Sequence, residues 1–130
     1  MINQLMLIDD NEDDQLVYRR IVRRSGLVEN LHQFFLAEEA LTFLSDQACP
    51  TIDAILLDIN MPGMDGFQFL EAATKDFGDS FVKVAVIMLT TSLIEDDKQR
   101  ANQYAIVKGY LNKPLEQAHL EKIDQMLKDG

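Results

Sequence analysis

Short apolar runs alternate along this chain with segments whose apolar residues recur at helical spacing. The apolar runs predict five β-strands, at residues 5–8, 31–36, 54–58, 82–89 and 109–112. The periodic segments predict five helices, at residues 15–24, 38–44, 67–75, 94–104 and 115–127. Because each strand is followed by a helix, the pattern predicts a parallel sheet joined by right-handed crossovers.

The apolar character of the predicted strands indicates that they are buried. Residues 54–58 and 82–89 are nearly continuous apolar runs, which is typical of strands covered by helices on both faces. The predicted fold class is therefore α/β, a doubly wound (βα)5 domain with a five-stranded parallel sheet. In open sheets of this kind, ligands bind beyond the carboxyl ends of the strands.

Length and composition restrict the kind of protein. A chain of 130 residues with 47% apolar residues fits one domain, and its net charge of −10 argues against nucleic acid and against anionic membrane surfaces as partners. No apolar run is long enough to cross a bilayer, and the first residues lack a signal-peptide pattern. The single cysteine, Cys49, excludes an internal disulfide, so a cytoplasmic location is expected, with Cys49 as a partly buried packing residue.

Polar side chains collect where four of the predicted strands end. Asp9 and Asp10 follow the first strand, Asp58 closes the third, Thr90 lies at the end of the fourth with Thr91 and Ser92 behind it, and Lys113 follows the fifth. In a parallel sheet these positions share one edge. Two carboxylates about 4 Å apart repel by roughly 4 kcal/mol at an effective dielectric of about 20. Three carboxylates with one lysine therefore stay over-negative, and such a cluster can protonate, splay into water or bind a cation. Oxygen ligands favour Mg²⁺, and a metal, an ammonium and a hydroxyl together suit a phosphoryl group.

Each of these polar residues, taken alone, has a simpler interpretation. Acidic residues before a helix are common caps, which is the expected role of residues 11–14 and would also explain Asp9 and Asp10. Asp58 has no capping role, because a Pro-Gly turn follows it. A calcium loop starting at Asp9 is excluded, since Asp14 stands where glycine is needed and Arg20 where glutamate is needed. No Gly-Lys-Ser/Thr loop or Gly-rich dinucleotide fingerprint is present, and the acidic first loop disfavours a flavin phosphate.

Four stretches closely resemble the receiver domain of two-component response regulators. They are LIDD at residues 7–10, LDINMPGMDG at 57–66, MLTTS at 88–92 and YLNKP at 110–114, and the resemblance covers about residues 3–127. It implies a flavodoxin-like sheet with strand order 2-1-3-4-5. It also implies that residues 1–130 form a single receiver domain, and because the chain stops after the fifth helix, we expect no output domain.

The resemblance implies an acceptor and a metal site. Asp58 is expected to be the phosphoacceptor, which attacks the phosphorus of a phosphohistidine to give an acyl phosphate. Asp10 is expected to bind Mg²⁺ (or Mn²⁺) directly and Asp9 to bind it through water. Asp58 itself and the backbone carbonyl of Asn60 would complete the protein's share of the ligands.

The same resemblance implies a switch. Thr90 would hydrogen-bond the phosphoryl group, and Lys113 would pair with Asp58 and then with a phosphoryl oxygen. The Lys113–Pro114 peptide bond is expected to be cis. Tyr110 would be the aromatic switch residue, whose ring turns inward when Thr90 shifts. The helix at 94–104 has a thin apolar face (Ile94, Ala101 and Tyr104), which suits a weakly held, movable element as well as an ordinary surface helix.

Two features depart from the family pattern or vary within it. Residues 104–109, YAIVKG, stand where many members carry a Gly-Ala pair before the fifth strand, so the resemblance does not define the turn into that strand or the output surface around it. Asn60 and Ser92, each two residues after a site residue, are positions that influence how fast the phosphoryl group is lost. The catalytic positions are unaffected.

The expected function is that of a phosphoryl-accepting signalling switch or relay intermediate rather than a turnover enzyme. Its donor would be a histidine kinase or a histidine phosphotransfer protein, its output a protein contact, and its state a monomer or a phosphorylation-dependent dimer. Arg19, Arg20, Arg23 and Arg24 form a basic stripe on the first helix that could dock the donor or be an ordinary solvated face. The alternatives are a binding module that is never phosphorylated, a metal-dependent phosphohydrolase, which would want a general acid where Asn60 stands, and a flavin-binding electron carrier.

Overall fold

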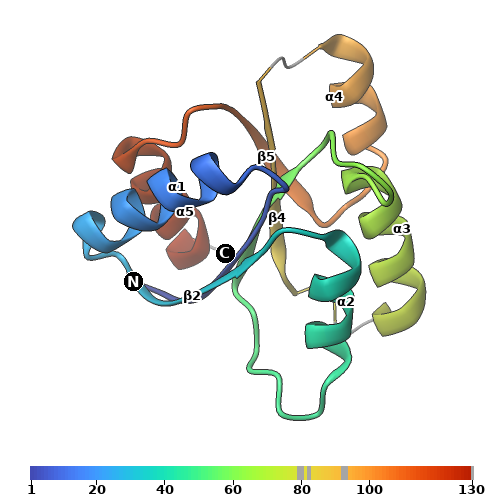
Figure 1. The fold of residues 1–130 in the computed structure, drawn as a ribbon, viewed down its shortest axis with the longest axis horizontal. Helices are drawn as coiled ribbons and strands as arrows, with labels where there is room; N and C mark the ends of the chain where they lie inside the picture. The colour runs from blue at the N-terminus through green and yellow to red at the C-terminus, as the bar shows by residue number, and fades with distance from the viewer. Residues whose placement is uncertain (79–80, 82, 92–93, 130) are drawn as a thin grey trace.

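A parallel sheet of five strands runs through the molecule in the order β2-β1-β3-β4-β5 (Figure 1). This computed structural model describes residues 1–78, 81, 83–91 and 94–129. The strands are β1 (Ile2–Ile8), β2 (Val28–Phe34), β3 (Ala54–Asp58), β4 (Ala85–Thr90) and β5 (Val107–Asn112). The helices are α1 (Glu12–Ser25), α2 (Ala37–Ser45), α3 (Gly66–Phe77), α4 (Glu95–Ala101) and α5 (Gln117–Asp129). The predicted fold class and strand order are confirmed.

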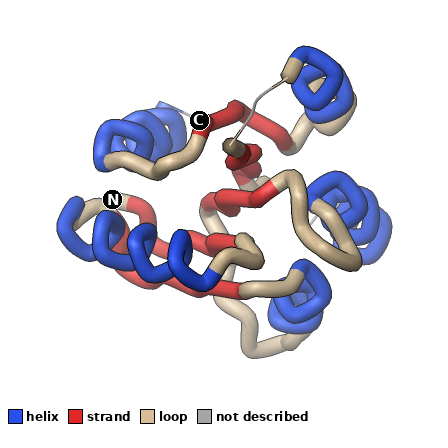
Figure 2. The backbone as a smooth tube through the Cα atoms, turned by 45° about the horizontal axis from the view of Figure 1, so that its top comes forward, coloured by secondary structure: helices blue, strands red, loops and turns tan. Residues whose placement is uncertain are grey.

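Helices cover both faces of the sheet, with α1 and α5 on one face and α2, α3 and α4 on the other (Figures 1 and 2). Alternate residues of each central strand enter two separate cores. Met6 and Ile8 pack toward α2 and α3, whereas Leu5 and Leu7 pack toward Tyr18 of α1 and its neighbours. All five residues of β3 are buried. Burial on both faces is the reason that the central strands carry continuous apolar runs.

Four of the five strands differ from the prediction in their limits. β1 begins at Ile2 rather than at residue 5, and β5 begins at Val107 rather than at residue 109. The second strand was expected at residues 31–36, but it runs from Val28 to Phe34, and Phe35 and Leu36 are exposed. The fourth was expected to begin at residue 82, which lies outside the described residues, but β4 begins at Ala85. Val84 is buried in the turn before β4, and its backbone N–H donates to the carbonyl of Phe81 at 3.1 Å. Buried apolar residues in the turn before β4 therefore made the predicted strand too long at its start.

Helix α4 is shorter than the predicted segment 94–104. It ends at Ala101, and Tyr104 lies beyond it. Ile94 precedes the helix and is 51% exposed, so of the three apolar residues expected on its face only Ala101 is buried within the helix. The expected thin apolar face is thus reduced to a single buried residue.

Local signals in the sequence explain where two functionally important helices begin. The side chain of Asn11 accepts a hydrogen bond from the N–H of Asp14 at 2.9 Å and caps α1. Asp65 and Gln68 form a reciprocal capping box at the start of α3. Both helices start directly after loops that leave the carboxyl ends of β1 and β3. Within the described chain, no helix is long and apolar enough to cross a membrane.

Candidate functional site

The strand register brings the predicted site residues to one edge of the sheet. Ile8 pairs with Leu57, so Asp9 and Asp58 follow neighbouring positions of β1 and β3. Thr90 is the last residue of β4 and is buried. Lys113 follows β5, and its backbone N–H donates to the carbonyl of Thr90 at 2.7 Å. The polar residues at or just after the ends of four strands therefore lie at the same edge of the sheet.

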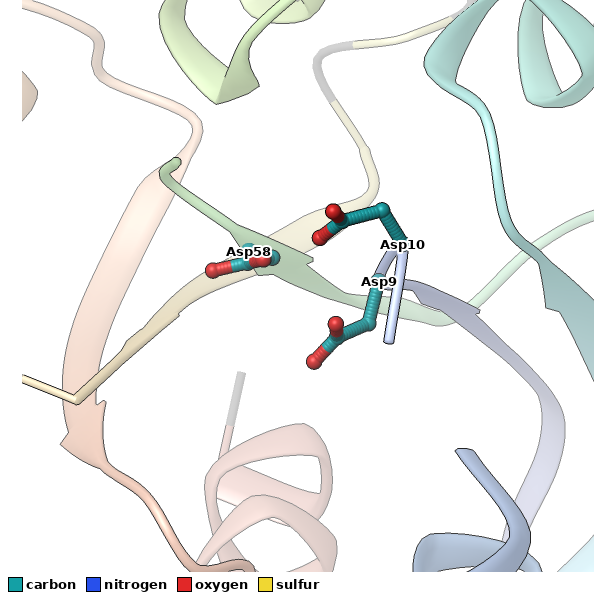
Figure 3. A group of neighbouring side chains, drawn as sticks. All are labelled: Asp9, Asp10 and Asp58. Atoms are coloured by element: carbon teal, nitrogen blue, oxygen red, sulfur yellow. The ribbon is translucent and has the colours of Figure 1, made fainter. Parts of the chain in front are cut away.

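Three carboxylates meet at this edge. One oxygen each from Asp9, Asp10 and Asp58 lies within 4.8 Å of the others. Figure 3 shows Asp9 and Asp10 projecting from the end of β1 and Asp58 from the end of β3 into a common space. Asp9 is fully buried and Asp58 is 4% exposed, while Asp10 is partly exposed. The predicted acidic cluster thus exists, and its one open side is formed by Asp10.

Lys113 is the cation of this cluster. Its Nζ lies 2.8 Å from Asp9 Oδ2, 3.5 Å from Asp14 Oδ2 and 3.6 Å from Asp58 Oδ1. The lysine was expected to pair with Asp58, but its shortest contact is with Asp9. The peptide bond between Lys113 and Pro114 is cis, the isomer that the resemblance implies.

The charges of the site alter its acid–base properties. Burial and the nearby Asp9 carboxylate raise the pKa of Asp58 to about 7, although Lys113 partly opposes them. Burial alone would lower the pKa of Lys113, but the carboxylates of Asp9, Asp58 and Asp14 raise it above its ordinary value. Without a further cation, the site therefore keeps Asp58 partly protonated near neutral pH.

The donor set fits a hard divalent cation. Three carboxylates face a single ammonium, so the cluster carries an uncompensated negative charge. Asp9 Oδ2 is buried, and within the described chain its close contact is the ion pair with Lys113 rather than a well-directed hydrogen bond. Carboxylate oxygens with one open side match the preference of Mg²⁺, which keeps several waters.

Two residues of the first helix belong to the site although the sequence did not single them out. Asp14 was expected to be mainly a helix-start acid, but it also contacts Lys113. Gln15 is buried, and its Nε2 donates to the carbonyls of Leu7 (3.3 Å), Asp9 (3.1 Å) and Phe34 (2.9 Å). The sequence offered one signal for Gln15, its spacing from Tyr18. Residues three positions apart lie on the same face of a helix, so Gln15 faces the sheet together with the buried Tyr18.

The remaining predicted residues lie around the cluster. The hydroxyl of Tyr110 donates to the carbonyl of Lys98 at 3.1 Å and also contacts Asn102 Oδ1, so this ring is tied to α4. Asn60 is exposed in the loop after β3. Ser92, the other flanking position, lies outside the described residues. The structure thus gathers Asp9, Asp10, Asp58 and Lys113, with Thr90 alongside.

Comparison with known families decides what this arrangement is. Residues 5–124 match the response regulator receiver domain family. The chain belongs to this family. Receiver domains are signalling phosphoacceptors that bind Mg²⁺ at an aspartate cluster, and this structure contains a group of three aspartates, Asp9, Asp10 and Asp58.

Relatives of this receiver domain include both short and longer proteins. A two-component response regulator from Cytophaga hutchinsonii has a crystal structure that superimposes with a TM-score of 0.92 at 26% identity, covering 99% of this chain and 98% of that one. Protein PilH of Pseudomonas aeruginosa is 29% identical over 119 residues, 92% of each chain. The heme response regulator HssR of Staphylococcus epidermidis is 34% identical over 116 residues, 89% of this chain but 46% of HssR. The receiver domain thus spans about half the length of HssR.

Proposed function

We propose that this receiver domain takes a phosphoryl group onto Asp58 and thereby switches a protein-binding surface in a two-component or phosphorelay system. The observation that carries the proposal is the placement of Asp58. It is buried at the end of β3, within 4.8 Å of the carboxylates of Asp9 and Asp10 and 3.6 Å from the ammonium of Lys113. A carboxylate in such surroundings has both a cation site and an ammonium beside it, which a phosphoryl group requires.

The transfer step needs an ionised nucleophile. One carboxylate oxygen of Asp58 forms a bond to phosphorus while the bond from phosphorus to a histidine nitrogen breaks, and its electron pair stays on the imidazole. Because burial and Asp9 raise the pKa of Asp58 to about 7, neighbouring positive charge is needed to favour the ionised form. Return to the resting state follows when water attacks phosphorus and the Asp58 oxygen leaves as carboxylate.

Asp10, Asp9 and Asp58 would hold Mg²⁺, with the backbone carbonyl of Asn60 as a further ligand. When bound, the ion supplies positive charge against the carboxylates and the phosphoryl oxygens. Lys113 neutralises part of the remaining charge, since it already lies within 3.6 Å of two cluster carboxylates. Thr90, buried at the end of the neighbouring strand, is positioned to orient a phosphoryl oxygen through its hydroxyl.

The output is proposed to pass through Thr90 and Tyr110 to the surface of α4, β5 and α5. Phosphorylation adds about −1.5 to −2 charges at neutral pH, which draws Lys113 and Thr90 toward the phosphoryl group. Tyr110 is one strand away from Thr90, and its hydroxyl is bonded to α4. Because α4 buries little apolar surface, its position costs little to change. A shift of Tyr110 would therefore alter a binding surface on α4.

The donor is proposed to be a histidine kinase or a histidine phosphotransfer protein of the cytoplasm. Arg19, Arg20, Arg23 and Arg24 are exposed on α1, which begins beside the acidic cluster. A basic stripe on the helix that also supplies Asp14 to the acidic cluster can orient an acidic helical partner and raise its rate of association. The protein is proposed to be a monomer or a dimer that forms on phosphorylation.

The alternative activities lack a matching group. A phosphohydrolase using Asp58 would need a proton donor two residues later, where Asn60 provides only an amide. A module that is never phosphorylated would have no need of the acceptor, the two metal-binding acids and the lysine together. A flavin carrier would place a phosphate where the loop after β1 enters α1, and the first turn of α1 carries three carboxylates that would repel it.

Intact mass spectrometry tests the proposal. The protein is incubated with Mg²⁺ and acetyl phosphate, and separately with a phosphorylated histidine kinase. One added phosphoryl group is expected, and it is expected to be absent from Asp58→Asn and from metal-free protein. Steady release of phosphate from several phosphoesters would instead support a hydrolase. No adduct with any donor or kinase would overturn the proposal.

A further inference from the structure

Four residues at the carboxyl edge of the sheet form a closed ring of contacts. The backbone N–H of Asn11 donates to Asp9 Oδ1 at 3.0 Å, and the N–H of Asp14 donates to Asn11 Oδ1 at 2.9 Å. Asp14 Oδ2 lies 3.5 Å from Lys113 Nζ, which in turn lies 2.8 Å from Asp9 Oδ2. Asp14 is therefore connected to the acidic cluster both through the backbone and through the lysine.

The backbone of Asp14 is held firmly in this position. The next residue, Gln15, is buried, and its Nε2 lies 2.9–3.3 Å from the carbonyl oxygens of Leu7, Asp9 and Phe34, which fixes the first turn of α1 against β1 and β2. Gln33 Nε2 further donates to Gln15 Oε1 at 2.8 Å. A side chain on a first turn anchored in this way loses little additional freedom when it contacts Lys113.

We propose that Asp14 is a positioning residue that competes with Asp58, and with an arriving phosphoryl group, for the ammonium of Lys113, and so restrains phosphoryl uptake. The inference rests on the function proposed above. Lys113 Nζ is 3.5 Å from Asp14 and 3.6 Å from Asp58, so the two carboxylates share the ammonium almost equally. Uptake of a phosphoryl group requires Lys113 to give up one of its present partners. Asp14 also adds a negative charge that repels an anionic donor.

A helix-start role does not account for this contact. Glu12, Asp13 and Asp14 all occupy the first turn of α1, where each carboxylate benefits from the helix dipole. Of these three, Asp14 is the one for which the described residues provide an ion pair with Lys113. Asp13 is exposed one position earlier. Asp13→Asn thus removes the same charge from the same helix turn without touching the ring, which makes it a matched control.

The test compares initial rates of Asp58 phosphorylation by acetyl phosphate with Mg²⁺ in wild type, Asp14→Asn, Asp13→Asn and Asp14→Glu. At low ionic strength we expect Asp14→Asn to be labelled about threefold faster than Asp13→Asn, and Asp14→Glu to stay near the wild-type rate. The side chain of Asp14 is 40% exposed, so this ratio should fall toward one near 1 M salt, where the Debye length is about 3 Å. A merely structural role for Asp14 would not depend on salt in this way.

A second measurement is independent of phosphorylation. In metal-free protein with labelled lysine, the Cε resonance of Lys113 is expected to shift in Asp14→Asn and to stay in place in Asp13→Asn. An unchanged Lys113 resonance in Asp14→Asn would overturn the inference. So would equal phosphorylation rates for Asp14→Asn and Asp13→Asn, provided that the wild type is phosphorylated. Failure of the wild type to accept phosphate from any donor would instead overturn the proposed function, and the resonance would still decide whether Asp14 holds Lys113.

Discussion

The backbone of Gly66 lies so close to Asp58 that a β-carbon on residue 66 would stand 2.6 Å from the carbonyl oxygen of Asp58. The same atom would lie 3.1 Å from the Cα of Ile59, and the N–H of Gly66 donates to the carbonyl of Ile59 at 2.9 Å. The first residue of α3 is therefore in direct contact with the chain that leaves β3. This contact fixes the direction in which the loop carrying Asn60 departs from the acceptor.

Gly66→Ala should damage both the fold and the site. The new methyl group meets rigid backbone, so we expect the free energy of unfolding to fall by about 2–3 kcal/mol and phosphoryl labelling to slow at least tenfold. Urea unfolding and intact mass measure the two effects. Gly109→Ala is the control, because a β-carbon there meets no atom within 4 Å. Equal behaviour of the two variants would show that the close approach at Gly66 is unimportant.

Asp58→Asn should stabilise the metal-free protein at alkaline pH. The pKa of Asp58 is about 7 in the folded state against an ordinary value of 3.8, so its ionisation above pH 7 costs folding free energy. At pH 8 the amide should gain about 2–4 kcal/mol, and the gain should shrink as the pH falls from 7 to 4, where the wild-type carboxyl becomes protonated in both states. Urea unfolding at several pH values measures this.

Added Mg²⁺ separates this effect from a general change in packing. The ion should raise the unfolding midpoint of wild type at pH 8 and raise that of Asp58→Asn much less, since one ligand is gone. Asp13→Asn should follow wild type with and without the ion. A constant gain of Asp58→Asn from pH 4 to pH 8 would contradict the raised pKa.

Gln15→Leu should loosen the segment after β1, where Asp9 and Asp10 are proposed to hold Mg²⁺. The change removes the contacts of Gln15 Nε2 with the carbonyls of Leu7, Asp9 and Phe34, which costs about 1–3 kcal/mol of stability even though the carbonyl of Phe34 keeps the N–H of Asp9. Mg²⁺ affinity, measured by calorimetry, should weaken about tenfold because the backbone of Asp9 is no longer held. Gln33→Leu, which keeps all three of these bonds, should bind Mg²⁺ nearly as wild type does. A normal affinity in Gln15→Leu would contradict the positioning role of Gln15.

The central strands were predictable because their burial fixes their composition. β3 occupies Ala54–Asp58, as predicted, since both of its faces are covered. The edge strand β2 was misplaced toward residues 31–36 because its polar residues conceal its start, while the exposed Phe35 and Leu36 extend the apolar run beyond its end. β1 likewise begins at Ile2 rather than at residue 5, and its polar start is held by Asp53, whose carboxylate accepts the N–H groups of Asn3 and Gln4.

The acidic cluster was predictable because parallel strands end at one edge, so residues at strand ends must meet. The involvement of Asp14 was not, because it depends on the rotation of α1 about its axis. Asp14 resembles any helix-start acid in the sequence, and only the packing of α1 against β1 brings it to Lys113. The preference of Lys113 for Asp9 over Asp58 is a difference of 2.8 against 3.6 Å, which sequence spacing cannot resolve.

Charge reversal on α1 tests the proposed docking surface. Arg20→Glu with Arg23→Glu should slow phosphoryl transfer from a phosphorylated histidine kinase at least tenfold at low salt, because both side chains are exposed on the basic stripe of α1. Labelling by acetyl phosphate should change little, since neither arginine reaches the acidic cluster. Lys75→Glu with Lys83→Glu makes the same change in net charge elsewhere. An unchanged kinase rate in the α1 variant would eliminate the docking role.

The most direct measurement locates the modified residue. Protein incubated with acetyl phosphate and Mg²⁺ is treated with borohydride, which reduces an aspartyl phosphate to homoserine, and the peptides are then mapped by mass spectrometry. The account predicts homoserine at position 58, dependent on Mg²⁺, with Asp9, Asp10 and Asp14 intact. Homoserine at one of those three positions, or equal labelling without a divalent ion, would contradict the assignment of Asp58 as the acceptor of a metal-dependent site.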